Sequence, residues 1–175
     1  MTSDKKNKFL EFPNGFLWGT ATSGHQVEGN NVNSDWWSWE QMNKGKVLDV
    51  KEEKFQGKEF EPSGKACDHY NKYNEDFALI SKLNNNAYRM SIEWARIEPK
   101  PGDFDYNEIK HYHDVLSDLK KRGIQVMLTL NHFTVPQWMA MKGGWTNWLS
   151  AKFFERWPSD NSAFARCISS YRSRS

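Results

Sequence analysis

Residues 124–138, with the sequence IQVMLTLNHFTVPQW, decide the fold of this chain. Residues 124–130 are apolar apart from one Gln and one Thr, which is typical of a strand buried on both faces of a parallel sheet. Gly123 stands directly before them, where a glycine commonly ends a helix. The Asn-His-Phe sequence of residues 131–133 then follows at the strand end where parallel α/β folds bind ligands. We expect a buried strand leading into a candidate site, although a core strand before an ordinary loop would show the same pattern.

Strands and helices alternate along the rest of the chain. The short apolar run Phe16–Trp18 predicts a first strand, and residues 87–92 (AYRMSI) predict a second. Residues 30–66 show little periodicity and are expected to form a long loop between the first strand and the first helix. A strand-helix-strand-helix-strand order predicts a parallel sheet with right-handed crossovers, and therefore an α/β fold.

Two segments have the apolar period of a helix. Residues 67–83 predict one, with an apolar stripe that we expect to continue to Leu83. The second is expected to begin at Asp105 and to end near Arg122. Asp105 and Glu108, three residues apart, resemble a capping box at its start.

Composition excludes some classes of function. The net charge is only +2 and the basic residues form no dense run, so nucleic-acid binding is not indicated. Nine Trp, eleven Phe and six Tyr would fill an aromatic core or line a site that stacks on flat apolar faces such as those of sugar rings. Two cysteines favour a reducing compartment, and the sequence suggests neither a signal peptide nor a membrane span. We therefore expect a cytoplasmic protein.

Two polar side chains accompany the first two predicted strands. Gln26 offers a donor and an acceptor on one planar group, which suits a sugar diol, although a lone Gln is more commonly a surface loop residue. Arg89 alternates with apolar neighbours, so we expect it to point into the space that the strands surround. A buried guanidinium needs an acceptor, most often a carboxylate.

The C-terminal tail differs from the rest of the chain. Residues 158–175 contain three Arg, six Ser and no Lys, and they show no helical or strand period. We divide the chain into a folded part, residues 1–157, and a tail, residues 158–175, that is either disordered or translated out of frame. Translation of the downstream DNA in the other two frames tests the second explanation.

Four segments in order, FLWGTATSGHQVEG, YRMSIEWARIEP, TLNHFTVPQW and GGWTN, closely resemble the N-terminal part of glycoside hydrolase family 1, the β-glucosidase and β-galactosidase family. The resemblance covers about residues 10–157. It implies a partial (β/α)8 TIM barrel holding the first three βα units only, with its site at the C-terminal ends of the strands. It also implies a retaining mechanism with two glutamates, an acid/base and a nucleophile, without metal or cofactor.

The resemblance also assigns individual roles. Gln26 matches the family glutamine that binds the terminal sugar, and His132 matches the histidine that binds the 3-hydroxyl of the same sugar. Arg89 matches the arginine that holds the nucleophile ionised. At Phe133 the family usually has Trp, so the apolar wall is kept and the indole N–H is lost.

Neither catalytic glutamate is expected in this chain. The family places the acid/base in an Asn-Glu-Pro motif and the nucleophile in a Glu-Asn-Gly motif, and neither motif occurs here. We therefore predict that the isolated chain is inactive, marginally stable, and prone to self-association through unpaired barrel edges. The expected partner of the parent enzyme is a β-glycoside or oligosaccharide. A non-catalytic sugar-binding or scaffold module is the alternative, and nucleic-acid binding has only the Arg/Ser tail in its favour.

Overall fold

The computed structural model describes residues 11–47 and 57–159. Its elements in chain order are β1 (Gly19–Ala21), α1 (Gly24–Val27), α2 (Asp35–Asn43), α3 (His69–Lys82), β2 (Ala87–Ser91), α4 (Trp94–Ile97), α5 (Tyr106–Lys121), β3 (Gln125–Thr129), α6 (Gln137–Met141), the 3-10 turn η2 (Gly144–Thr146) and α7 (Ser150–Ser159).

The three strands form one parallel sheet in the order β1-β2-β3. Arg89 at the centre of β2 is in register with Ala21 of β1 and Met127 of β3. Two crossovers, one through α3 and one through α5, join the strands, as the alternation in the sequence predicts. Within the described residues β1 and β3 each pair only with β2, so each has one free edge there.

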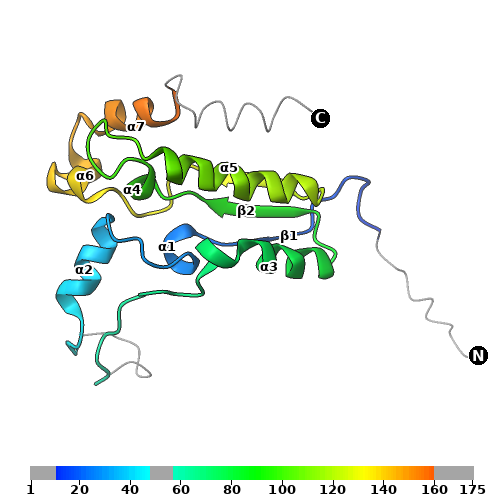
Figure 1. Ribbon diagram of the computed structural model, residues 1–175, viewed down its shortest axis with the longest axis horizontal. Helices are drawn as coiled ribbons and strands as arrows, with labels where there is room; N and C mark the ends of the chain where they lie inside the picture. The colour runs from blue at the N-terminus through cyan, green and yellow to red at the C-terminus, as the bar shows by residue number, and fades with distance from the viewer. Residues whose placement is uncertain (1–10, 48–56, 160–175) are drawn as a thin grey trace, which may run out of the picture.

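Helices α3 and α5 run along the sheet (Figure 1) and cover one of its faces. Tyr88 and Met90 of β2 point to this face and are buried, and the ring of Phe77 from α3 lies 5.5 Å from that of Tyr88. The core of the protein lies between the helices and the sheet. Its buried members come from both long helices, from β2, from the residue before β3, and from the turns and short helices that follow β2 and β3: Phe77, Ile80, Tyr88, Met90, Ile92, Trp94, Ile97, Ile109, Tyr112, Val115, Leu116, Leu119, Ile124, Val135 and Met139.

The two long helices follow their sequence patterns closely. The Asp105 carboxylate accepts hydrogen bonds from the backbone N–H groups of Asn107 (2.8 Å) and Glu108 (3.4 Å), so Asp105 caps α5 as predicted. The other half of the predicted capping box is not formed, because the Asp105 N–H donates to the Ile97 carbonyl at 2.8 Å. Helix α3 begins at His69, but the apolar stripe does not continue to Leu83, which is 68% exposed. Leu83 lies in the C-cap of α3, where the chain turns away from the helix.

The first strand was predicted three residues too early. Phe16 and Trp18 are exposed and form a cluster with Phe12, whose rings meet at tilted or edge-to-face angles with centroids 4.6–4.9 Å apart, and β1 itself begins at Gly19. Small residues are needed in the strand because the backbones lie so close. A Cβ on Gly19 would lie 2.5 Å from the carbonyl oxygen of Ala87. The apolar run therefore marks the segment that precedes β1, whereas β1 itself consists of small residues.

The prediction that β3 is buried on both faces is wrong for this chain. Met127 is 64% exposed and Gln125 is also exposed, whereas Val126 and Leu128 face the helices and are partly buried. In the described residues the helices cover one face of the sheet and nothing covers the other. The apolar residues on the open face match what a closed barrel would bury in its interior.

Helix α2 interrupts the long loop expected over residues 30–66. Ser34 caps it by accepting a hydrogen bond from the backbone N–H of Trp37 at 3.1 Å. The sequence does not predict this helix, because the apolar residues of α2 do not repeat with a helical period. Both ends of α2 are placed by contacts to distant segments, including the hydrogen bond from the backbone N–H of Asp35 to the Val135 carbonyl at 3.0 Å.

The predicted tail lies mostly outside the described residues. Helix α7 ends at Ser159, so a domain boundary at residue 157 stays a prediction, and residues 160–175 lie outside the description. Cys67 is exposed and unpaired, and Cys167 lies outside the described residues. In the described part of the chain, no helix combines the length and the hydrophobicity that crossing a membrane would require.

Candidate functional site

The helices and turns that follow the strands gather beyond the C-terminal end of β2. Figure 1 shows α1, α2, α4 and α6 on that side of the sheet. The chain enters α1 directly after β1, and the residues that lead into α6 directly follow β3. Parallel strands bring these turns to one edge of the sheet, where α/β barrels place their sites.

Gln26 lies on α1 with an exposed side chain. Its Oε1 accepts a hydrogen bond from the Ser23 hydroxyl at 2.6 Å, which leaves the amide N–H groups directed away from that contact. The position of α1 is set from β2, because the backbone N–H of Gly24 donates to Ser91 Oγ at 2.8 Å. Gln26 is thus an exposed amide on a helix whose start is tied to the sheet.

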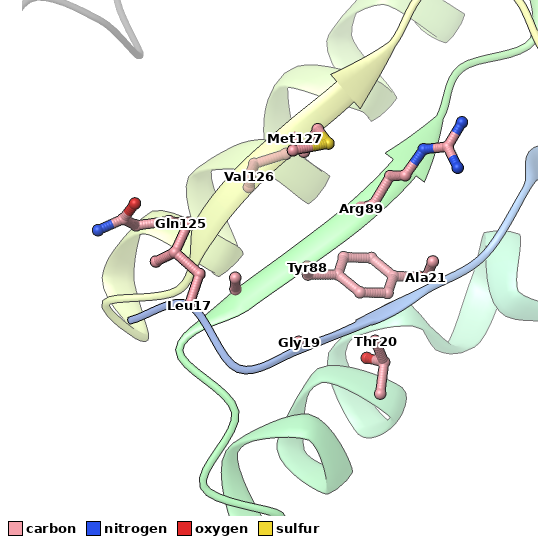
Figure 2. Close-up of a pocket in the computed structure, with 10 residues that line it drawn as sticks. Leu17, Gly19, Thr20, Ala21, Tyr88, Arg89, Gln125, Val126 and Met127 are labelled. Atoms are coloured by element: carbon pink, nitrogen blue, oxygen red, sulfur yellow. The ribbon is translucent and has the colours of Figure 1, made fainter. Parts of the chain in front are cut away.

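Arg89 projects from β2 on the face of the sheet that the helices leave open. Figure 2 shows its guanidinium extending toward the arrowhead of β2, beside a hollow to which Ala21 and Met127 also contribute. Its Nε donates to Thr129 Oγ1 at 3.1 Å. Arg89 is exposed on the open face of the sheet and its acceptor is a hydroxyl rather than a carboxylate, so its place inside a closed barrel stays a prediction.

His132 and Phe133 follow β3 and form one end of a row of rings that we call the aromatic wall: His132, Phe133, Trp36 and His25. The rings of His132 and Phe133 meet edge to face at 4.6 Å, and Phe133 stacks on Trp36 at 5.7 Å with an interplanar angle of 10°. Trp36 in turn meets His25 at 5.5 Å. Phe133 is 67% exposed and has a φ of 68°, a left-handed conformation that is costly for a bulky residue.

The wall joins the turn after β1 to the turn after β3. His25 is the neighbour of Gln26 on α1, so three of the four predicted site residues, Gln26, His132 and Phe133, belong to two segments in contact. Arg89 stands apart from this row on the open face of β2. Sequence reasoning missed Trp36 and His25. The cluster of three Trp at residues 36–39 was the available signal for the first, and nothing in the local pattern indicated the second.

A buried carboxylate lies beneath the wall. Glu93 is 1% exposed and accepts hydrogen bonds from the backbone N–H of His25 (2.9 Å), from Asn31 Nδ2 (2.6 Å) and from Thr134 Oγ1 (2.8 Å). Burial raises the pKa of Glu93, and these hydrogen bonds act in the opposite direction. The sequence predicts no role for Glu93, because a Glu between two apolar residues carries no sign of its partners.

A second buried group lies next to it. The Glu28 carboxylate pairs with Arg96 Nε at 2.9 Å and accepts from the Tyr112 hydroxyl at 3.0 Å. That hydroxyl also accepts a hydrogen bond from the backbone N–H of Glu93 at 3.1 Å, and the Arg96 guanidinium lies over the ring of Tyr70. Burial raises the pKa of Glu28 to about 7, against the opposing effect of Arg96.

Chemically, the site offers hydrogen-bonding groups beside the exposed rings of Trp36 and Phe133. Gln26 can donate to hydroxyl oxygens, His132 can donate or accept, and the face of an aromatic ring suits the C–H face of a sugar. Among the described residues there is no group of three or more His, Cys, Asp or Glu side chains placed to hold a metal ion.

A parallel sheet with helices on one face, and with polar and aromatic turns after its strands, defines this chain as part of a (β/α)8 barrel. A model of the family described as glycosyl hydrolase family 1 matches residues 9–166. The chain belongs to this family, as its four sequence motifs predict.

Three similar proteins show how much of a family member is present. Beta-glucosidase A of Thermotoga maritima is 34% identical over 149 residues, which are 82% of this chain and 31% of that protein. A beta-glycosidase from Pyrococcus horikoshii has a TM-score of 0.77 and 38% identity, covering 92% of this chain and 34% of its own. A beta-glucosidase from Thermotoga maritima in complex with castanospermine has a TM-score of 0.72 and 33% identity, covering 83% of this chain and 32% of its own. The chain thus spans about a third of the length of the proteins it matches.

Proposed function

We propose that this chain supplies the first three βα units, and with them part of the sugar-binding pocket, of a retaining β-glycosidase that removes terminal β-D-glucosyl or galactosyl residues. One observation carries the proposal: Gln26, His132 and Phe133 lie on the turns that follow β1 and β3, and the aromatic wall joins those turns in a member of glycosyl hydrolase family 1. A similar protein, a beta-glucosidase from Thermotoga maritima, is known in complex with castanospermine.

The residues of this chain would orient the sugar. Gln26 would hydrogen-bond adjacent hydroxyls, His132 would bind a third hydroxyl, and Phe133 would pack against the apolar face of the ring. Arg89 would lie beneath the nucleophile and favour its ionised form. Together these contacts would place the anomeric carbon for in-line attack.

Bond cleavage would need residues from outside these 175. Retaining hydrolysis uses two carboxyl groups about 5–5.5 Å apart, one of which attacks while the other protonates the leaving oxygen. Neither family motif that carries such a glutamate occurs in the sequence. We therefore propose that the chain by itself does not hydrolyse glycosides, and that its unpaired strand edges favour self-association.

A chimera tests the contribution to sugar binding. The matching segment of Thermotoga maritima beta-glucosidase A would be replaced by residues 11–155 of this chain, and hydrolysis of nitrophenyl β-glucoside and β-galactoside would be measured. We expect activity, and we expect Gln26→Ala and His132→Ala each to lower kcat/KM about 100-fold. The matched controls are Gln41→Ala and His113→Ala, whose side chains are exposed on α2 and α5 and should change kcat/KM little.

The isolated chain provides the second test. Purified full-length protein should release no nitrophenol. The proposal would be contradicted if the purified chain released nitrophenol and if replacing one of the chain's own carboxylates abolished that release. Tight binding of castanospermine by a folded monomer in calorimetric titration would instead support the alternative, a non-catalytic sugar-binding module.

We further propose a cytoplasmic location, supported by the low cysteine content and by the exposed thiol of Cys67. Fractionation of producing cells would test this location. Recovery of the protein in the periplasmic or culture fraction would contradict it.

A further inference from the structure

Glu93 follows β2 at the N-cap of α4, yet its carboxylate does not cap its own helix. It faces three donors from outside that segment. Oε1 accepts from the backbone N–H of His25, and Oε2 accepts from Asn31 Nδ2 and from Thr134 Oγ1, at 2.6–2.9 Å. Hydrogen bonds from three neutral donors to one buried anion are strong contacts in a site that excludes water.

The donors come from the two segments that carry the proposed sugar-binding residues. His25 precedes Gln26 on α1, and Asn31 follows the same helix. On the other side, Thr134 directly follows Phe133, and its backbone N–H donates to the His132 carbonyl at 2.9 Å. One carboxylate therefore contacts both segments at once, from a position just after β2, the strand that lies between β1 and β3.

The fit around Glu93 leaves little freedom. A Cβ on Gly24 would lie 2.6 Å from Cγ and from Oε1 of Glu93, so α1 packs directly against the carboxylate. The backbone of Glu93 is held in place as well, because its N–H donates to the Tyr112 hydroxyl at 3.1 Å. Because the Glu93 carboxylate is fixed in this way, it can fix the positions of the three groups that donate to it.

We propose that Glu93 is a positioning residue that locks the turn after β1 to the turn after β3, and so sets the spacing between Gln26 and His132. Its link to sugar chemistry rests on the proposed function, whereas its link between the two turns rests on the hydrogen bonds alone. The side chain itself is buried beneath the aromatic wall and acts through its neighbours.

The test compares Glu93→Gln with Glu98→Gln in the full chain, with trimethylamine N-oxide present to favour the folded state. Glu98 is a matched control, because it is also fully buried but accepts hydrogen bonds at 2.7 Å from Trp94 Nε1 and from the Gly102 N–H, both close in sequence. Glutamine keeps the shape of the side chain and turns one acceptor into a donor that faces other donors.

Two signals report the coupling without any sugar. In Glu93→Gln we expect amide exchange of His25 to accelerate at least 10-fold relative to the core amides, and the NMR cross-peaks between the Trp36 and Phe133 rings to vanish. In Glu98→Gln both signals should stay as in the parent. If His25 exchange in Glu93→Gln rises only as much as core exchange, or if both variants lose the ring cross-peaks alike, Glu93 is a general stabilising residue and the proposal is wrong.

A milder variant covers the case in which Glu93→Gln does not fold. Thr134→Val removes one donor and keeps the side-chain shape, so it should abolish the ring cross-peaks while His25 stays protected. Loss of His25 protection together with the cross-peaks, or retention of both, would overturn the proposal.

The chimera separates this inference from the proposed function. In an active chimera, Glu93→Gln should raise KM and lower kcat together, reducing kcat/KM about 10-fold more than Glu98→Gln does. If the chimera is inactive while the exchange and cross-peak results appear as expected, the proposed function fails and the coupling by Glu93 stands. If the chimera is active and the two variants have equal kcat/KM, the positioning role is refuted.

Discussion

Replacing Tyr112 by Phe removes a single buried oxygen and leaves the ring in place. Tyr112 is fully buried on α5, and its hydroxyl donates to the Glu28 carboxylate and accepts from the backbone N–H of Glu93. The substitution creates no large cavity, so its effect on stability reports the two hydrogen bonds and little else.

The expected loss follows from the two contacts. A hydrogen bond to a charged group contributes about 1.5–3 kcal/mol, and leaving a buried N–H without a partner costs about 1–3 kcal/mol. We therefore expect Tyr112→Phe to lower the free energy of unfolding by about 3–5 kcal/mol. This is a large fraction of the total for a domain of this size, which is commonly about 5–15 kcal/mol.

Urea unfolding of the full chain at pH 8.5, above the raised pKa of Glu28, followed by tryptophan fluorescence, measures this loss. Tyr106→Phe is the control, since that side chain is 69% exposed and its replacement should change stability by less than about 0.5 kcal/mol. If Tyr112→Phe unfolds the chain outright, amide exchange of Glu93 in trimethylamine N-oxide replaces the urea curve and should lose its protection. A loss below about 1 kcal/mol, or one equal to that of Tyr106→Phe, would refute the reasoning.

Three further predictions concern charge, packing and backbone. Because burial raises the pKa of Glu28 from 4.5 to about 7, the folded state binds the proton more tightly than the unfolded state, so stability should fall by about 3 kcal/mol between pH 4.5 and 7 and stay level above. Urea curves of parent and Glu28→Gln across that range measure it, and a difference between them that is constant with pH would contradict it. Leu119→Ala should cost about 2–5 kcal/mol in urea unfolding because the side chain is fully buried, and a loss no larger than that of the exposed Leu83→Ala would be the contrary result. Gly29→Ala should destabilise by at least about 2 kcal/mol, because its φ is 80° and the new Cβ would lie 2.0 Å from the carbonyl oxygen of Lys65. A melting temperature equal to that of the parent would count against it.

Local sequence was sufficient for the two long helices and for the central strand of the sheet. Helix α5 carries its own start signal at Asp105 and its own apolar stripe, so neither needs the rest of the chain to be recognised. The same holds for β2, whose alternating residues separate Arg89 on the open face from Tyr88 and Met90 on the covered one. In these elements the residues that determine the structure are neighbours in the sequence.

The start of β1 and the existence of α2 depend on distant segments. Gly19 is a strand residue because it must lie against Ala87, which no local pattern expresses. Helix α2 begins where the turn after β3 meets it, and its Trp36 finds a stacking partner in Phe133 almost a hundred residues away. A prediction from hydrophobicity alone therefore places β1 too early and does not find α2.

The sequence by itself determined the class of fold and the family, because local periods and motifs of adjacent residues carry both. It also predicted Gln26, Arg89, His132 and Phe133 as site residues. Only the tertiary structure revealed that Trp36 and His25 continue the aromatic wall and that Glu93 contacts both of its turns. The physical reason is that the role of a buried carboxylate depends on which donors surround it in the folded chain. Those donors come from positions 25, 31 and 134, which become neighbours only when parallel strands bring their ends to one edge of the sheet.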